Sequence, residues 1–194
     1  GEFIADRNNI TRVWMDHGFW PLLTTKFYID QTGDVSVLLK ENSYFKDRQE
    51  MRGTATDDTF SKEDAPLLKD VAGNVYKGTL LEHILIQNLT AFYEVGEHNH
   101  MRLRGADWND ALDMAAERGE SVAFTAAYSQ NMDTLADLIE ALCKKEGLTS
   151  LAVAKELESL FCDDVAAYES IEKKSELLAG YCKSVYPKVS GEKV

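Results

Sequence analysis

Four consecutive residues carry the side chains that glycoside chemistry needs. Asp107, Trp108, Asn109 and Asp110 stand in a row within the stretch RLRGADWNDALDMAAERGESV. Cleavage of a glycosidic bond requires a carboxylic acid that protonates the leaving oxygen, beside an apolar surface that holds one face of the sugar. Asp110 and Trp108 supply these two groups, and the amide of Asn109 is suited to bind sugar hydroxyls. The carboxylate of Asp107 would raise the pKa of a neighbouring acid and keep it protonated near neutral pH.

The same residues also have a purely structural interpretation. Asp107 is a typical N-cap for a helix that begins near Ala111, and Asp110 would then lie in the first turn of that helix. Negative side chains interact favourably with the helix dipole at this end. Trp108 would pack inward. The local sequence leaves both interpretations open.

The segment from Gly105 to Val122 resembles a motif of inverting sugar phosphorylases. GADWNDALDMAAERGESV is similar to the GGDWNDGMN and GESVW motifs of the cellobiose phosphorylase type, glycoside hydrolase family 94 and its relatives. Upstream, GTLLEHILIQNLTAFYEVG resembles the helix that precedes the motif. DHGFWPLLTTKFYIDQTGD resembles the family's SDDYLWLP stretch with its helix and TGD turn. The resemblance spans about residues 12 to 142.

This resemblance implies a fold and a set of site residues. The family fold is an (α/α)6 barrel with the active site at one mouth, and its general acid, the last aspartate of DWND, corresponds to Asp110. Trp108 is similar to the family's sugar-binding tryptophan. Asp107 and Asn109, in the same motif, are predicted to bind substrate. Alanines at 106 and 111 replace glycines of the common pattern, which suggests an acceptor other than that of cellobiose.

An upstream group of residues is predicted to complete the sugar site. Asp16 falls where the family has an aspartate that holds glucosyl hydroxyls, and Trp20 follows four residues later. Arg12 is a candidate for the same subsite, although its spacing to Asp16 differs from the family spacing. The structural alternative is that Asp16 caps a helix that begins at Phe19.

The resemblance implies phosphorolysis of a β-linked glucoside, a disaccharide or a β-glucan oligosaccharide, with inversion to an α-sugar 1-phosphate. This reaction needs one carboxylate of the protein. An inverting hydrolase requires an acid and a base that activates water, whereas phosphate is already a nucleophile. The resemblance therefore implies inorganic phosphate as co-substrate, with no metal or organic cofactor. Arg102 and Arg104 would favour an anionic co-substrate, although salt bridges on a solvated surface are the commoner role of such residues. In the family the phosphate-binding residues lie well downstream of DWND.

Apolar residues spaced near 3.6 apart predict the helices that carry these motifs. One helix begins at Leu80, where Thr79 and Glu82 form a capping-box pattern. Further helices are predicted at about 19–28, 34–42, 128–142, 151–161 and 170–185. Residues 42–77 are predicted to form a long loop within a single domain of residues 1–194. We expect an all-α fold of helical hairpins forming part of an (α/α)6 barrel. Because six hairpins need about twice this length, we expect the chain to be a central piece of a longer enzyme.

Composition narrows the class of protein and its partners. The 194 residues are 44% hydrophobic and 28% charged, with a net charge of −12, so the chain is a globular protein without a nucleic-acid surface. No run approaches the roughly 18 apolar residues of a membrane helix, and the N-terminus lacks a signal-peptide pattern. Three cysteines at spacings of 19 and 20 predict reduced thiols of a cytoplasmic protein. His98 and His100 are interpreted as a polar turn, not a metal site.

Two other functions remain open at this point. One is an inverting glycoside hydrolase related to the glucoamylases, with Asp110 as acid and a base elsewhere, such as in the 42–77 loop. The other is a non-catalytic helical interaction domain that docks a partner through its amphipathic helices. For the preferred function, the expected partners are a β-glucoside and phosphate, with no nucleic acid and no membrane. The resemblance also suggests a homodimer.

Overall fold

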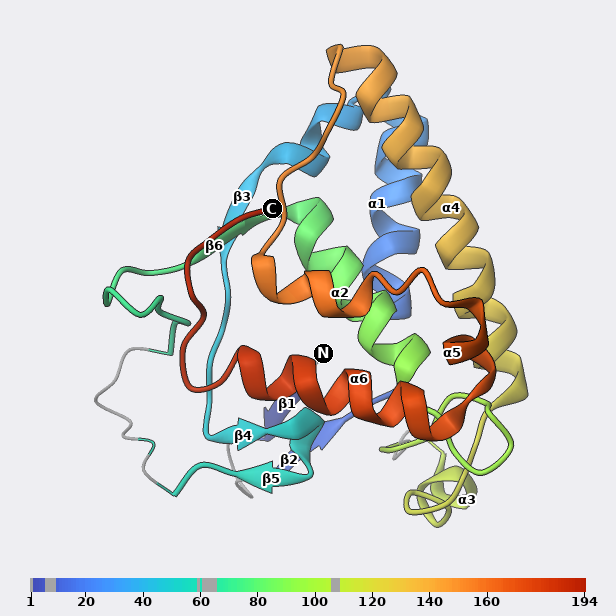
Figure 1. Ribbon diagram of the computed structural model, residues 1–194. Helices are drawn as coiled ribbons and strands as arrows, with labels where there is room; N and C mark the ends of the chain where they lie inside the picture. Colours follow the sequence, from blue (N-terminus) through green and yellow to red (C-terminus); the bar gives the residue numbers. More distant parts are fainter. Residues whose placement is uncertain (1, 6–9, 59, 61–65, 106–108) are drawn as a thin grey trace.

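Long helices form the main body of the protein (Figure 1). The computed structural model describes residues 2–5, 10–58, 60, 66–105 and 109–194. The α-helices within this part are α1 (Phe19–Thr32), α2 (Leu80–Tyr93), α3 (Asp110–Asp113), α4 (Val122–Glu146), α5 (Val165–Glu169) and α6 (Ile171–Ser184). Helices α1, α2 and α4 pack against one another, and α6 packs against α2. Helix α2 is therefore the central helix of the body.

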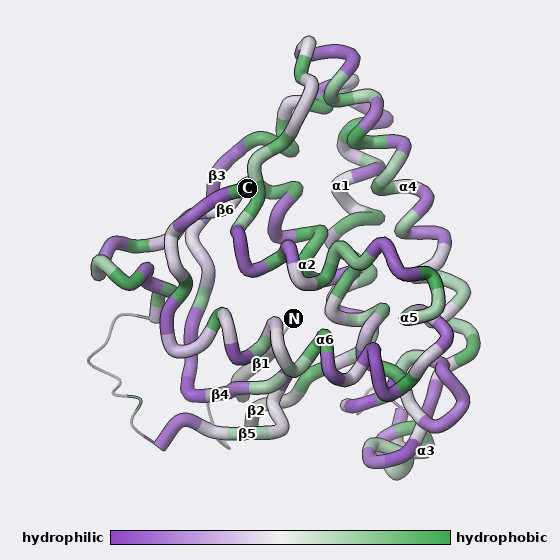
Figure 2. Tube along the Cα trace, viewed as in Figure 1, coloured by the Kyte–Doolittle hydropathy of each residue, from purple (hydrophilic) through white to green (hydrophobic). Residues whose placement is uncertain are grey.

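The hydrophobic core lies where these helices meet. Its fully buried members include Leu22 of α1, Leu81 and Ile84 of α2, and Leu135 and Leu142 of α4. Hydrophobic and hydrophilic residues alternate along α4 in Figure 2, as expected for a helix with one buried face.

Two buried asparagines join the three helices inside this core. The Nδ2 of Asn131 in α4 donates to the Oδ1 of Asn88 in α2 at 3.0 Å and to the carbonyl of Phe19 in α1 at 3.5 Å. The Nδ2 of Asn88 donates to the carbonyl of Ile84 at 2.9 Å. These bonds satisfy polar groups that would otherwise be costly to bury, and they fix the relative position of the helices.

The prediction of an all-α chain is wrong, because the described residues also form antiparallel sheets of two strands each. These are β1 (Glu2–Ala5) with β2 (Ile10–Val13), β3 (Glu41–Ser43) with β6 (Lys77–Thr79), and β4 (Gln49–Glu50) with β5 (Ala55–Thr56). Most of these strands lie in or beside residues 42–77, the predicted long loop. Strands of two to four residues are too short to show an alternating pattern, so helical periodicity could not reveal them.

The predicted start of α2 and the predicted helix at 170–185 are confirmed, whereas α1 and α4 extend beyond the predicted 19–28 and 128–142. Helices α1 and α4 end at Gly33 and Gly147, whose φ angles of 69° and 66° are left-handed, a conformation that glycine adopts without steric cost. The Oγ1 of Thr79 caps α2 by accepting from the backbone N–H of Glu82 at 3.1 Å. The predicted helix at 151–161 is wrong in type, because the structure has a 3-10 helix, η3 (Lys155–Leu160), after an extended segment. The predicted helix at 34–42 is likewise a 3-10 helix, η1 (Val35–Leu39).

The side chain of Glu82 does not complete the predicted capping box. It turns into the core, where it is fully buried. Its Oε1 accepts from the hydroxyls of Tyr44 at 2.8 Å and Tyr76 at 3.1 Å, and its Oε2 accepts from the backbone N–H of Ala154 at 2.9 Å. The ammonium of Lys193 lies 3.4 Å from the same Oε2. Glu82 therefore links α2 to three distant parts of the chain.

Among the residues that the structure describes, no helix is both long enough and apolar enough to cross a bilayer.

Candidate active site

The two segments that the sequence analysis assigned to a sugar site lie side by side. The backbone N–H of Gly105, which enters the DWND segment, donates to the carbonyl of Val13 at 2.8 Å. Trp14 forms isolated β-bridges with both Arg104 and Gly105. A Cβ on residue 105 would lie 2.4 Å from the Cδ1 atom of Trp14, so only glycine allows this close approach. Local β-pairing thus brings the Asp16 segment to the DWND segment.

Asn109 begins the short helix α3. Its Oδ1 accepts from the backbone N–H groups of Ala111 at 3.1 Å and Leu112 at 3.3 Å, so Asn109 and not Asp107 holds the N-cap position. Asp110 is the first residue of α3, which agrees with the structural interpretation that placed it in the first turn of a helix. The structure describes the backbone of Asp110. Asp107 and Trp108 lie outside the described residues.

Asp16 and Trp20 contact each other directly. The indole Nε1 of Trp20 donates to the Oδ2 of Asp16 at 2.8 Å, and the Trp20 side chain is half exposed. Asp16 does not cap α1 through its side chain, because the N-cap position belongs to Gly18 and no side chain caps it. The Oδ1 of Asp16 is buried and accepts no hydrogen bond among the described residues.

Arg12 is placed by its backbone in β2, where it pairs with Phe3 of β1. It directly precedes Val13, whose carbonyl holds Gly105. The structure thus places the backbone of Arg12 close to the other predicted residues.

A polar cavity of about 400 Å³ is lined by residues that precede and residues that follow the DWND segment in the sequence. Its lining residues are Val13, Arg52, Gly53, Arg104, Gly105, Asp113, Ala116 and Glu117. Arg104 and Gly105 precede the motif, and Asp113 is the last residue of α3. Carboxylates and guanidinium groups together supply hydrogen-bond acceptors and donors for a neutral, hydroxyl-rich ligand. We call this space the polar cavity.

Two arginines that line the polar cavity, Arg52 and Arg104, share one glutamate as their partner. Glu94, the C-cap of α2, accepts from the Nε of Arg52 at 2.5 Å and from the Nε of Arg104 at 2.6 Å. The Nη1 of Arg52 also donates to the Oγ1 of Thr90 at 3.0 Å. The three charged side chains are between 8% and 23% exposed. Cations at the C-terminal end of a helix also interact favourably with its dipole.

Electrostatics within this cluster favour the charged forms. Burial raises the pKa of Glu94, but Arg52 and Arg104 outweigh burial, and the pKa ends below its ordinary value. Burial lowers the pKa of Arg52, but the Glu94 carboxylate outweighs burial and the pKa ends above its ordinary value. Glu94 and Arg52 are therefore both ionised at neutral pH.

Both arginines have unusual backbone conformations. Arg52 has a φ angle of 55° and Arg104 has one of 52°, in the left-handed region that side chains larger than glycine rarely adopt. Each such residue costs about 1–3 kcal/mol, and strain of this kind gathers at functional sites. The shared bond to Glu94 offsets part of this cost.

Sequence reasoning did not identify Arg52 and Glu94. Arg52 lies in the region predicted as a loop, and Glu94 follows a helix with no motif of its own. Arg104 was noted as a cation beside an acidic motif, and its partner proves to be a carboxylate with only 8% exposure. Arg52 lies 42 positions before Glu94 and 52 positions before Arg104, so their proximity leaves no local signal in the sequence.

The EHNH turn is organised by an acid from the GESV motif. The carboxylate of Glu120 accepts from the backbone N–H groups of His98 and His100 at 3.0–3.1 Å and lies 3.0 Å from the Nδ1 of His98. Among the described residues there is no group of three His, Cys, Asp or Glu side chains that could hold a metal ion.

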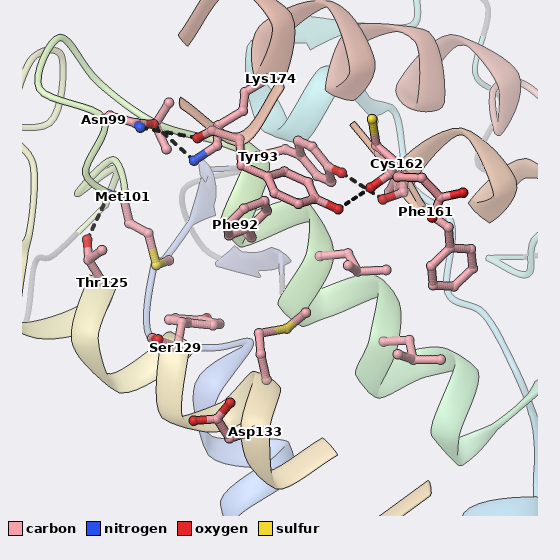
Figure 3. Close-up of a pocket in the computed structure, with 18 residues that line it drawn as sticks. Phe92, Tyr93, Asn99, Met101, Thr125, Ser129, Asp133, Phe161, Cys162 and Lys174 are labelled. Carbon is pink, nitrogen blue, oxygen red and sulfur yellow. Dashed lines mark hydrogen bonds between the residues drawn. The ribbon is translucent and has the colours of Figure 1, made fainter. Parts of the chain in front are cut away.

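A larger and mainly apolar cavity of about 640 Å³ lies between α2, α4 and the segment around Cys162 (Figure 3). Lys174 reaches its edge, where the Nζ donates to the Oδ1 of Asn99 at 2.9 Å and lies 4.2 Å from the centre of the Phe92 ring. Burial lowers the pKa of Lys174. None of the predicted site residues that the structure describes lines this cavity, so it is distinct from the predicted sugar site.

Comparison with known proteins gives one functional indication. No family model matches the chain. The chain is 29% identical over 131 residues, 66% of its length, to a solabiose phosphorylase of Paenibacillus borealis. The 194-residue chain is therefore similar in sequence to a sugar phosphorylase. The matched part spans 15% of that relative's length.

Proposed function

We propose that this chain is the part of a longer glycoside phosphorylase that carries the general acid. The similarity to a sugar phosphorylase carries the proposal, because it agrees with the chemistry predicted for the DWND segment. The pairing of Gly105 with Val13 supports it, since it holds the chain just before DWND beside the chain just before Asp16. We also propose a cytoplasmic location, because Cys143 and Cys162 form no disulfide bond.

The proposed substrate is a β-linked glucoside, either a disaccharide or a β-glucan oligosaccharide. The polar cavity, at about 400 Å³, falls within the usual size range of small-molecule sites. Asp113 and Glu117 would accept hydrogen bonds from sugar hydroxyls, and Arg52 and Arg104 would donate them.

In the proposed reaction Asp110 acts once, as an acid. The carboxylic acid gives its proton to the bridging oxygen while the bond from the anomeric carbon to that oxygen breaks. An oxygen of phosphate forms the new bond to the anomeric carbon from the opposite face, which inverts the configuration. The products are an α-sugar 1-phosphate and a sugar shortened by one glucosyl unit. No second protein carboxylate is needed, because phosphate takes the place of activated water.

The first prediction tests Asp110 in the longer enzyme. Asp110→Asn should lower kcat by about 10²–10⁴-fold, because general acid catalysis contributes that much. The assay incubates β-glucosides with and without phosphate and measures sugar 1-phosphate. Asp137→Asn, at an exposed position of α4, is the control and should keep full activity.

Two results would contradict this proposal. Equal turnover without phosphate would identify a hydrolase. Full activity of Asp110→Asn would leave Asp110 with only a structural role at the start of α3.

A further inference from the structure

A third cavity gathers positive charge in a protein that is acidic as a whole. It measures about 250 Å³ and lies between the C-terminal end of α2 and one face of α6. Arg52, Arg102 and Arg104 line it on one side, and Ser175 and Leu178 line it from α6. We call it the arginine cavity. It adjoins the polar cavity, because Arg52 and Arg104 line both.

The described lining of the arginine cavity holds one carboxylate for three guanidinium groups. Glu94 pairs with Arg52 and Arg104 together. The recorded acceptors of Arg102 are neutral carbonyls, those of Val95 at 3.3 Å and Glu117 at 3.2 Å. Two positive charges are therefore in excess, although the whole chain carries a net charge of −12.

Two further acids line the neighbouring space. Asp113 and Glu117 line the polar cavity and do not line the arginine cavity. The lining of the arginine cavity itself therefore keeps its excess of positive charge. Partly buried cations lose hydration, and a bound anion would restore the lost interactions.

We propose that the arginine cavity binds a tetrahedral oxyanion, either inorganic phosphate or the phosphate group of a sugar phosphate. Guanidinium groups present planar pairs of N–H donors that match phosphate oxygens. The cavity has room for such an ion, since one water occupies about 30 Å³ and phosphate has only five heavy atoms. The hydroxyl of Ser175 on the opposite wall is suited to hydrogen-bond the ion. This inference concerns binding alone and stands without the proposed reaction.

The second prediction places a negative charge on the wall of the arginine cavity. Ser175 is exposed on α6, so Ser175→Glu adds a carboxylate there without disturbing the core or the Glu94 cluster. It should weaken phosphate binding by at least about tenfold, because like charges a few ångströms apart repel strongly in a partly buried site. Ser175→Gln is the matched control, with the same size and no charge, and should bind within about twofold of the original protein.

Binding is measured by the broadening and shift of the phosphorus-31 signal when the 194-residue chain is added to inorganic phosphate. A second arm uses glucose 1-phosphate, and the two dissociation constants identify which source of phosphate is preferred. Arg102→Gln keeps the Arg52–Glu94–Arg104 cluster and should weaken binding as well. Circular dichroism spectra and melting curves verify that each variant is folded.

No signal change with either ligand would overturn the proposal, as would equal affinities of Ser175→Glu and Ser175→Gln. The proposed function is tested separately from phosphate binding, because its test measures the turnover of the enzyme and of the Asp110→Asn variant.

Discussion

At the scale of single residues, Glu94 is the group on which the site's electrostatics depend. It is the shared acceptor of two arginines with left-handed backbones, and it also ends α2. Removal of one partner from a buried ion pair leaves the other charges uncompensated and costs more than the pair itself contributes. Glu94 is the acid that pairs with both Arg52 and Arg104, so neutral Glu94 weakens two ion pairs at once.

The third prediction concerns Glu94→Gln. We expect it to lower the free energy of unfolding by about 3 kcal/mol at neutral pH. Because the folded pKa of Glu94 lies below its ordinary value of 4.5, its stabilisation is fully present above pH 4.5 and is lost as pH falls through the folded pKa.

The difference between the original protein and Glu94→Gln should therefore shrink below pH 4.5. Urea unfolding at several pH values measures it. A difference that stayed constant down to the lowest pH tested would show that the Glu94 carboxylate contributes nothing through its charge.

At the scale of elements, the contact between the Trp14 and Gly105 segments positions the candidate active site. It needs a residue without a Cβ at 105, because the Trp14 ring occupies that space. Helix α3 has only one turn, so its position depends on the segments before it and on the Asn109 cap. The site is thus held by short β-pairing more than by the long helices.

The fourth prediction compares two glycine substitutions. Gly105→Ala should lower the free energy of unfolding by about 1–3 kcal/mol, because its Cβ overlaps the Trp14 ring. Gly180→Ala is the control, since that residue lies in the interior of α6 with nothing within 4 Å of the new methyl group. It should stabilise the protein by up to about 1 kcal/mol. Thermal and urea unfolding measure both, and a neutral Gly105→Ala would show that this contact can relax freely.

At the scale of the whole molecule, Glu82 joins parts of the chain that are far apart in sequence. Its carboxylate binds Tyr44, Tyr76 and Ala154, and Lys193 approaches it from near the C-terminus. Burial and the nearby Glu82 carboxylate raise the pKa of both tyrosines, so their hydroxyls stay protonated and donate. The strands β3 and β6 and the segment before η3 thus share one buried acceptor.

The fifth prediction is that Glu82→Leu lowers the free energy of unfolding by more than about 3 kcal/mol. Each buried donor that loses its acceptor costs about 1–3 kcal/mol. Glu140→Gln, at an exposed position of α4, is the control and should change stability by less than about 0.5 kcal/mol. Chemical unfolding measures both free energies. Similar stability of the two variants would mean that the four segments are held by apolar packing alone.

The sequence by itself indicated the long helices and the start of α2. The spacing of apolar residues in α2 and α4 and the cap at Thr79 are local signals, and helices are built from local contacts. The DWND chemistry was also visible, since residue types and their order need no structure. The role of Asp110 in catalysis stays a prediction.

Only the tertiary structure decided the remaining features. Short strands such as β3 and β6 form because distant residues meet, and helical periodicity carries no record of such pairing. The same holds for the site, where Arg52, Glu94 and Arg104 gather across 52 positions and Trp14 reaches Gly105 across 91. Glu82 has the pattern of a capping residue, but burial and two tyrosine donors turned it inward. The physical reason is common to all: hydrogen bonds and charges act over ångströms in space, whereas the sequence records only neighbours along the chain.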